Sequence, residues 1–440
     1  MESQVANLQN VAALSQSVHE NFVGKVQPWI EFMGPTLALF NQAAPGDFEL
    51  TGKEIVWARD LDFPTDAMST AGQLPDTAYF EPIRFTMTPT QTYVRRAVDN
   101  FTVARARGNG TFEDYIGRVM RQLWDAFERA QNRHVHGSSN GYIGKVDGRT
   151  SPTVFTIKDG LGFTGMNPLM FIRAGTRIAW LDASNSYIVG GVGTVQSVAP
   201  STKTVTMTAS FENGASAGGA QMAGNDPIVL VTTATESATY FKSEYGLAPL
   251  GLLDHVDPLG TAAAYCGVSE SAQPGIKTTR VTSSNFGEHE IMEWLQMISA
   301  KTGKPVTAQS HAITCQAAVT LALAKTLTPY TQIQQKGSTL QGGWTGVQIG
   351  QHEFFEDPFH VPDSAYALYR EGLHTINLDG DPRLFNGDGS EWQRLADFDG
   401  KEVFGYHYGQ RVVDNRNCFG ALNGIPVTNA DRFSADYIPV

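Results

Sequence analysis

Two histidines separated by one residue, His134 and His136, are the first residues that invite a chemical interpretation. Histidine is the commonest metal ligand, so a close pair could contribute to a transition-metal site. In a helix, however, positions two apart point to different faces, and no cysteine or carboxylate stands at ligand spacing from them. We therefore predict a solvated helix end, where histidine is favourable beside the C-terminal dipole, and no metal site.

An acidic stretch from Asp379 to Glu391 has the composition of a calcium-binding loop. It departs from the twelve-residue calcium loop because Pro382 and Leu384 stand where ligands are needed. Turns rich in Asp, Asn and Gly have the same composition for a conformational reason. Turn chemistry is the better interpretation of this stretch.

Other catalytic and cofactor-binding patterns are missing from the sequence. It contains no HExxH or GKS/GKT motif and no GxSxG nucleophile elbow between a predicted strand and a predicted helix. The glycine pairs at 190–191 and 218–219 lie in or beside predicted strands, so they do not form a phosphate-binding loop before a helix. Cys266, Cys315 and Cys418 are scattered without a CxxC pair, and we expect reduced thiols. The sequence predicts no cofactor and no enzyme.

The composition excludes further classes of protein. Only 17% of the 440 residues are charged, and the net charge is −12, which disfavours a protein that coats phosphate backbones. Aromatic residues are too abundant for a disordered chain. The N-terminus lacks the pattern of a signal peptide, and no run of 18 apolar residues occurs. We expect a soluble protein of cytoplasmic origin that spans no membrane.

The clearest element is a long helix predicted over residues 111–136. Thr111 can act as its N-cap, Asp114 stands in a capping-box-like position, and Gly137 ends it. At 1.5 Å per residue this helix is roughly 38 Å long, which suits a structural spine. Trp124 is expected in the core with the apolar stripe of the helix, which consists of Phe112, Tyr115, Ile116, Val119, Met120, Leu123, Phe127 and Ala130.

Two extended segments before this helix are predicted to pair as a long hairpin over residues 47–97. Alternation of apolar and polar residues is typical of half-buried strands, and residues 64–75 have the composition of a loose tip. A two-stranded hairpin is marginal alone and needs a surface to lie on. Residues 1–46 are predicted to form an arm that buries little within its own chain.

The second half of the chain alternates between β and α patterns, so the predicted class is α+β. Residues 163–235 are almost entirely β-like and predict an inserted small barrel or sandwich. In the remainder, 236–440, one helix is predicted around Trp294, ending at Gly303, and a second from Ser310 to Ala324. Residues 346–355 and 365–369 are predicted strands.

Charges are distributed unevenly. Residues 84–133 contain nine arginines against five acidic residues, whereas residues 353–402 contain twelve acidic residues against four basic ones. One interpretation is head-to-tail pairing between copies, because arginine is favoured at interfaces. The alternative is that both stretches are solvated or pair within one chain. The sequence leaves these two interpretations open.

The order of these parts resembles that of tailed-phage major capsid proteins, which have the Hong-Kong-97-type fold that encapsulins share. Arg107–Gly137 (RGNGTFEDYIGRVMRQLWDAFERAQNRHVHG) is similar to the spine helix of that family with its entry. Gly346–Ile376 (GVQIGQHEFFEDPFHVPDSAYALYREGLHTI) resembles a late strand-turn-strand. Thr239–His255 (TYFKSEYGLAPLGLLDH) resembles a connecting segment of the same proteins.

The resemblance implies a division of the chain into domains. Residues 1–46 would be the N-terminal arm, 47–97 the E-loop hairpin, and 98–162 the P-domain with its spine helix at 111–136. Residues 163–235 would be an inserted β domain, and 236–440 the A-domain with return strands of the P-domain. Some family members crosslink an E-loop lysine, but here only Lys53 lies in the hairpin, at its base, so covalent crosslinking is not expected.

The implied function is self-assembly, as hexamers and pentamers, into an icosahedral shell around double-stranded DNA that is not bound sequence-specifically. Its partners would be copies of itself, with scaffolding, portal and decoration proteins as further candidates, and it would be found in the virion capsid after assembly in the host cytoplasm. No scaffolding domain is evident at the N-terminus. The alternatives are an encapsulin-like cellular shell, a surface or glycan-binding virion protein, and an enzyme with a site assembled from distant residues. Aromatic residues and arginine dominate interfaces, and the hairpin residues expected to form them are Trp57, Arg59, Phe63, Tyr79, Phe80, Arg84 and Tyr93.

Overall fold

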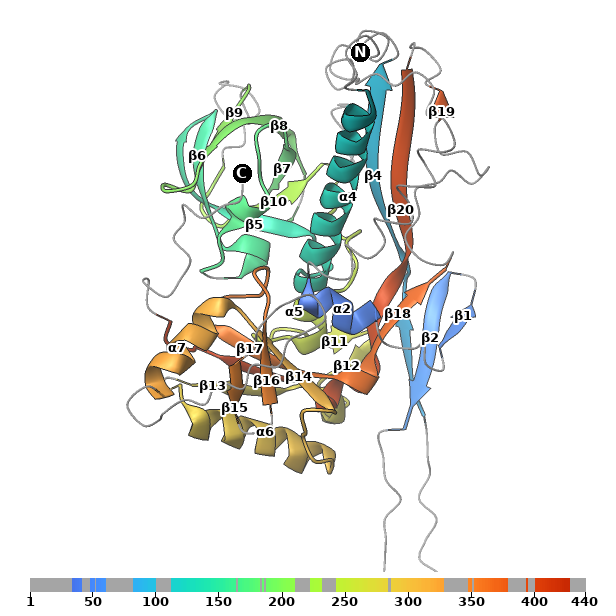
Figure 1. Cartoon of the computed structure of the whole chain (residues 1–440), viewed down its shortest axis with the longest axis vertical. Helices are drawn as coiled ribbons and strands as arrows, with labels where there is room; N and C mark the ends of the chain where they lie inside the picture. Colours follow the sequence, from blue (N-terminus) through green and yellow to red (C-terminus); the bar gives the residue numbers. More distant parts are fainter. Residues whose placement is uncertain are drawn as a thin grey trace, which may run out of the picture.

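The computed structural model describes residues 34–41, 48–51, 53–60, 82–99, 112–163, 165–182, 184–185, 187–209, 222–231, 243–283, 286–327, 347–349, 352–378, 393–394 and 400–427. Helices and sheets are mixed along the chain, which confirms the predicted α+β class. Figure 1 shows a tall part in which one long helix lies beside two long strands, a barrel next to it, and a body of helices and strands below. The order expected from the resemblance, which is hairpin, long helix and α+β body, is the order in the structure.

The hairpin base is a three-stranded antiparallel sheet of β1 (Glu49–Thr51), β2 (Glu54–Arg59) and β3 (Ile83–Met87). Alternate side chains are buried, as the period-two pattern predicts. The next strand leaves this sheet, so the predicted hairpin segment 47–97 also contains part of the spine sheet. The buried side chains pack on the body in one cluster, which contains Ile55, Trp57, Phe85, Met87, Tyr265, Ile276 and Val412.

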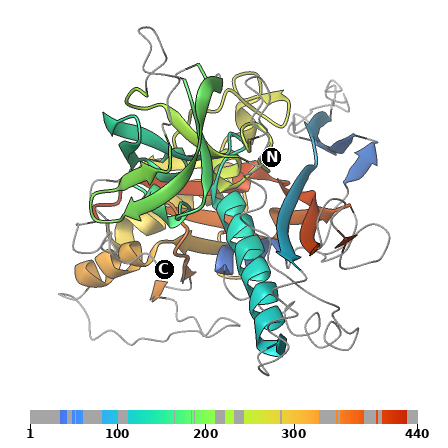
Figure 2. The same ribbon diagram turned by 90° about the horizontal axis from the view of Figure 1, so that it is seen from above.

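The tall part combines β4 (Thr90–Asp99), β20 (Gly400–Val413) and the helix α4 (Phe112–His136). β4 and β20 pair antiparallel along the whole of β4. α4, predicted at 111–136, is confirmed and packs against both strands. From above, the barrel and the β4–β20 ladder lie on opposite sides of α4 (Figure 2). Two short strands, β18 (Leu373–Asn377) and β19 (Gln393–Arg394), complete this sheet along β20.

The body is built on a six-stranded mixed sheet in the order β13-β21-β17-β14-β16-β15. Alternate residues of its central strands enter two separate hydrophobic clusters, so the sheet is covered on both faces. Helices α6 (Glu288–Thr302) and α7 (Ala317–Leu327) cover one face, and α2 (Pro35–Asn41) and α5 (Leu252–Val256) the other. The strands are β13 (Thr279–Thr282), β14 (His311–Cys315), β15 (Val347–Ile349), β16 (His352–Glu356), β17 (Ser364–Tyr369) and β21 (Gly420–Asn423).

Two predictions about this body are wrong. The helix predicted from Ser310 is the strand β14 up to Cys315, and α7 begins only at Ala317. The run is short and apolar, and such runs do not distinguish a buried strand from a buried helix. The arm, expected to bury little within its chain, contributes Leu37 and Phe40 of α2 to the core beneath the sheet.

The β-rich region forms a closed barrel in the order β10-β5-β6-β9-β8-β7, with Phe155 and Trp180 in its core. It includes two strands before residue 163, so the predicted boundary of the insertion lies too late in the chain. The register shifts of β5 against its neighbours interrupt the alternation that would have predicted it. The strands are β5 (Tyr142–Ser151), β6 (Val154–Lys158), β7 (Arg177–Leu181), β8 (Tyr187–Ala199), β9 (Thr204–Met207) and β10 (Pro227–Leu230).

Candidate assembly surfaces and a buried charge network

Trp57, the first of the predicted interface residues, is buried in its own chain. Its ring stacks on that of Phe85 with centroids 5.3 Å apart, and Phe48 packs edge-on at 5.5 Å. Because β2 and β3 pair with Trp57 opposite Phe85, the stack lies across the hairpin base. In a single subunit, Trp57 therefore anchors the hairpin to the body.

Arg59, at the end of β2, forms a two-point contact with the carboxylate of Asp414. Its Nε lies 2.5 Å from Oδ1, and its Nη2 contacts Oδ2. Asp414 directly follows β20, so this ion pair fixes the hairpin to the end of the long strand. A two-point contact with a carboxylate fixes the orientation of an arginine side chain. Arg59 is therefore an anchor within its own chain.

Arg84 and Tyr93 are the two predicted interface residues that the structure leaves exposed. The Tyr93 hydroxyl donates to Tyr408 at 2.8 Å, and half of Tyr93 (51%) is exposed. Partial burial and the hydrogen bond to Tyr408 raise the pKa of Tyr93 to about 12. Phe63, Tyr79 and Phe80 lie outside the described residues. The role of these residues between copies stays a prediction.

The basic and acidic stretches meet within one chain at Arg95 of β4 and Glu402 of β20, which form an ion pair across the ladder. The Arg95 side chain is 60% exposed and that of Glu402 is 15% exposed. This ion pair agrees with the interpretation that the basic and acidic stretches pair within one chain. A second arginine of the basic stretch, Arg133, is paired with Glu244 of the same chain at 2.7 Å, and the role of the remaining arginines between copies stays open.

The helix end at His134 and His136 is buried, which corrects the expectation of a solvated end. His136 Nε2 lies 3.0 Å from the Asp357 carboxylate, and both side chains are almost fully buried. His136 and a hydrogen bond from the Thr36 N–H hold the pKa of Asp357 well below its usual range. Since Thr36 belongs to α2, this pair attaches the arm to the body. Among the described residues, no group of His, Cys, Asp and Glu could hold a metal ion.

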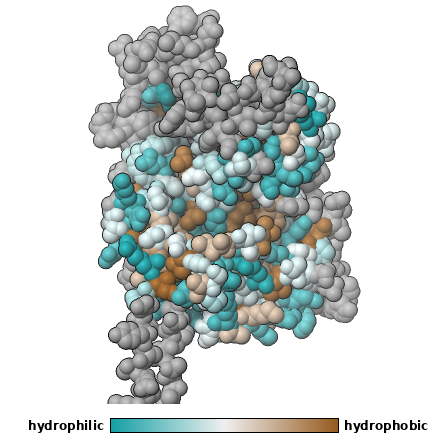
Figure 3. All heavy atoms as spheres, turned by 180° about the vertical axis from the view of Figure 1, so that it is seen from behind, coloured by the Kyte–Doolittle hydropathy of each residue, from teal (hydrophilic) through white to brown (hydrophobic). Residues whose placement is uncertain are grey.

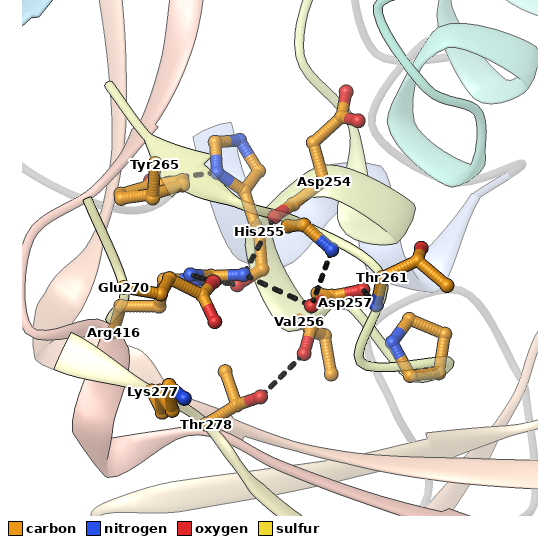
Figure 4. A network of polar contacts seen from close by, with 12 residues as sticks. Asp254, His255, Val256, Asp257, Thr261, Tyr265, Glu270, Lys277, Thr278 and Arg416 are labelled. Carbon is orange, nitrogen blue, oxygen red and sulfur yellow. Dashed lines mark hydrogen bonds and ion pairs between the residues drawn. The ribbon is translucent and has the colours of Figure 1, made fainter. Parts of the chain in front are cut away.

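An extensive polar network surrounds Arg416, which lies three residues after β20 in the short turn Arg416–Cys418 (Figure 4). Its Nε donates to the His255 carbonyl at 2.6 Å and its Nη2 to the Asp254 carbonyl at 3.1 Å. Its Nη1 forms an ion pair with Glu270, and the guanidinium lies 4.4 Å from the centroid of the Tyr265 ring. One buried side chain thus ties together α5, the segment that follows it, and the end of the long strand.

A second cation completes this network. Asp257 accepts Arg280 Nη2 at 2.6 Å and the backbone N–H groups of Thr261 and Ala262. Burial and the neighbouring Arg416 lower the pKa of His255 to about 3, so its ring is neutral at physiological pH. The buried charges neutralise one another, which suits a structural joint between the tall part and the body.

None of these network residues was identified from the sequence. Arg416 and Glu270 are 146 residues apart, and Arg416 is 161 residues from His255. The available signal was weak: Arg411 and Arg416 flank the apolar pair Val412 and Val413 at the end of a predominantly β-like stretch, and a charged residue that becomes buried must find a partner. That signal indicates burial without naming the partner.

No family model matches the chain, and no curated protein matches it. Several solved structures are similar. The capsid asymmetric unit of cyanophage A-1(L) is 12% identical, with a TM-score of 0.47 and coverage of 90% of this chain and 93% of that one. The capsid of a native GTA particle is 8% identical, with a TM-score of 0.42 and coverage of 88% and 90%. The holo-SrpI encapsulin of Synechococcus elongatus PCC 7942 is 12% identical, with a TM-score of 0.27 and coverage of 34% and 54%. These TM-scores are all below 0.5. Among the described residues, no helix is long and apolar enough to cross a membrane.

Proposed function

We propose that this chain is a major capsid protein of a tailed double-stranded DNA phage. Copies assemble as hexamers and pentamers into an icosahedral shell that encloses the genome, and the role is structural, without catalysis. Each copy presents one surface to a different surface of the next, and such heterologous contacts close into rings when the rotation allows. The shell forms in the host cytoplasm and ends in the virion.

The observation that carries this proposal is the row of exposed side chains on β4 in the β4–β20 ladder. Successive residues of a strand point to opposite faces, and Thr92 is buried whereas Gln91, Tyr93 and Arg95 are exposed. α4 packs against the ladder, and Arg411 of β20 donates to Gln131 of α4. The exposed side of the ladder carries tyrosine and arginine, the residue types that dominate interfaces.

Exposed apolar side chains support the same proposal. Large hydrophobic residues are exposed on several elements of the body, including Met292 and Met297 on α6 and Leu321 on α7. Seen from behind, hydrophobic residues gather near the centre of the molecule (Figure 3). Contiguous exposed apolar surface marks protein–protein contact sites in soluble proteins. A subunit that contacts several copies of itself would bury such apolar surface in those contacts.

The charge of the chain fits a container better than a DNA-binding protein. A net charge of −12 repels phosphate at long range. A wall of this sign encloses DNA without adhering to it. Sequence-specific contacts to DNA have no place in this proposal.

The test is deletion of residues 62–80, the segment between β2 and β3. The deleted chain should fold, because the hairpin base keeps its own packing on the body through Trp57 and Phe85. It should remain a monomer, because it lacks the hairpin segment that is proposed to contact the neighbouring copy. Electron microscopy and light scattering measure the outcome. Deletion of residues 214–220, in the sequence between β9 and β10, is the control and should leave shells intact. Normal shells from the 62–80 deletion would contradict the proposal.

Two alternatives predict different observations. An encapsulin-like shell of cellular origin would be encoded beside a cargo enzyme, whereas a phage shell would be encoded beside terminase and portal genes. A surface or glycan-binding virion protein that uses the barrel would be a monomer or trimer in solution. The mass of the purified particle separates this second alternative from a shell.

A further inference from the structure

Among the residues that the structure describes, β4 is paired along one edge only. β20 lies on one side of it, and β18 and β19 lie on the far side of β20. Other strands at the edges of sheets, such as β1, β13, β15 and β18, have at most five residues, and the barrel is closed. Short edge strands and closed sheets are the usual protection against pairing with another chain. β4 has ten residues without a proline or a bulge, so its open edge is suited to a further strand.

The register of the ladder shows which backbone groups lie on this open edge. The Tyr408 carbonyl accepts the N–H of Leu378, which directly follows β18. Even-numbered residues of β20 therefore face β18 and odd-numbered ones face β4, because a residue's N–H and C=O point to the same side of an antiparallel strand. Gly405 is opposite Val94, so the even-numbered residues of β4 make the ladder bonds. The groups on the open edge belong to Gln91, Tyr93, Arg95 and Ala97, and no described residue bonds to them.

The side chains along this edge favour a partner that offers an aromatic ring over one that offers a carboxylate. Arg95 already pairs with Glu402 of its own chain, so its charge does not need an acidic partner. Tyr93 is two residues away on the same face of the strand, and half of it is exposed. A guanidinium is attracted to the face of a tyrosine ring. Each copy of β4 therefore carries both halves of one cation–π contact, and a second copy supplies the complement of each.

One antiparallel register between two copies of β4 satisfies both the backbone and the side chains. The outward groups pair only when odd-numbered residues stand opposite odd-numbered residues. Registers centred on Arg95 or Arg96 place that arginine opposite the same arginine of the second copy, which is destabilising. A register centred on Tyr93 leaves the end of β4 unpaired. The register centred on Val94 pairs Thr90–Val98 on both strands and places each Tyr93 opposite an Arg95.

We propose that two copies of this chain pair through the open edges of β4 in the register centred on Val94. The two ladders then form one continuous sheet across a two-fold axis. This contact is isologous, because the same surface is used on both copies. It differs from the heterologous contacts within a ring and joins one ring to another. The inference rests on the proposed self-assembly and names one contact within it.

Val94→Cys tests this register in the assembled full-length chain. The two residues at position 94 form a non-hydrogen-bonded pair, in which the Cα atoms are about 4.5 Å apart, close enough for a disulfide. Mild oxidation should convert most of the variant into a covalent dimer on a non-reducing gel. Gln91→Cys is the matched control, because its two copies would be six positions, or about 20 Å, apart. Gln91 is more exposed than Val94, so exposure alone predicts the opposite result.

A second pair of variants tests the backbone bonds of the open edge. The N–H of Ala97 points away from β20, so Ala97→Pro removes a donor from the open edge and spares the ladder. Val94→Cys/Ala97→Pro should keep the circular dichroism spectrum of Val94→Cys and give about tenfold less dimer, because each pair of copies loses two hydrogen bonds. Val94→Cys/Ala97→Val keeps the N–H and should give as much dimer as Val94→Cys alone.

Each outcome separates this inference from the proposed function. Shells without a dimer from Val94→Cys would overturn the inference and leave the proposed function standing. A dimer in a sample without shells would support the β4 contact and contradict the proposed function. Neither shells nor dimer would contradict both. An equal yield of dimer from Gln91→Cys, or a disulfide from position 94 to Cys266, would place a different segment against β4 and overturn the inference.

Discussion

Arg416 and Arg95 each form an ion pair with a glutamate far away in the sequence, but in opposite surroundings. The Arg416 and Glu270 side chains are 2% and 4% exposed, whereas those of Arg95 and Glu402 are 60% and 15% exposed. Around Arg416, all three nitrogens of the guanidinium are engaged, by the His255 and Asp254 carbonyls and by the buried Glu270 carboxylate. Around Arg95, the ladder face is still accessible. The buried region therefore maintains the subunit, and the exposed region is available to another molecule.

The largest effect is expected from Arg416→Met. Removing one partner of a buried ion pair leaves the other charge uncompensated and costs about 3–5 kcal/mol of folding free energy. Arg280 lies 3.5 Å from Glu270 and does not replace the lost carbonyl contacts of Arg416. Urea unfolding of the purified chain measures the loss.

The double variant Arg416→Met/Glu270→Leu sharpens this prediction, because it removes both buried charges. It should be more stable than the single variant. If Arg416→Met alone unfolds at the same urea concentration as the wild type, the network does not have the structural role given to it here.

A smaller effect with a distinct pH dependence is expected at Asp254. Burial raises the pKa of its carboxyl from 3.8 to about 6, so the folded state binds the proton more tightly than the unfolded state. The stabilisation from this proton is complete below pH 3.8 and is lost as the pH rises through 6. Asp254→Asn, which keeps an oxygen for the Ser139 N–H, should therefore be more stable than the wild type by about 1–3 kcal/mol at pH 8.

The gain from Asp254→Asn should fall to a small remainder near pH 4, where the carboxyl of the folded wild type is protonated and that of the unfolded chain is only partly ionised. Urea unfolding at pH 4, 6 and 8 measures it. Asp147→Asn, at an exposed position of β5, is the matched control. A gain that is the same at all three pH values would contradict the explanation by protonation.

Arg95→Gln should change stability by at most about 1 kcal/mol, because exposed ion pairs contribute little. The change should become smaller at high salt, which screens the pair. Thermal unfolding at 50 mM and 500 mM NaCl tests this. A loss as large as that of Arg416→Met would remove the contrast between the two regions.

Tyr93→Ala should have the smallest effect on stability, below about 0.5 kcal/mol, since half of the side chain is exposed. It should nevertheless lower the yield of shells, because exposed tyrosines are frequent energetic centres of interfaces. Gln91→Ala on the same face is the control for a polar residue. Normal shell yield from Tyr93→Ala would place the subunit contact elsewhere.

Local patterns were sufficient to predict parts of this fold. α4 was predicted to within one residue because its apolar stripe recurs at helical spacing from Phe112 to Ala130. The end of α6 was predicted because Gly303, with φ of 67°, ends it where the sequence indicated. A long element with a sustained hydrophobic period can be recognised from the sequence alone. The class of the fold followed from the order of such elements.

The remaining features depend on contacts between segments far apart in the chain. Phe40 is buried because α5 and the body sheet cover it, and no property of residues 1–46 indicates this. His136 is buried because Asp357, 221 residues later, lies against the end of α4. Trp57 and Arg59 were chosen by residue type, which does not distinguish an anchor within the chain from one between chains.

The mass of the purified particle is the most direct test of the central claim. Light scattering of the expressed full-length chain should give a particle in the megadalton range, with closed shells in electron micrographs. A monodisperse species of 47.8 kDa, the mass of one chain, would contradict the proposed function.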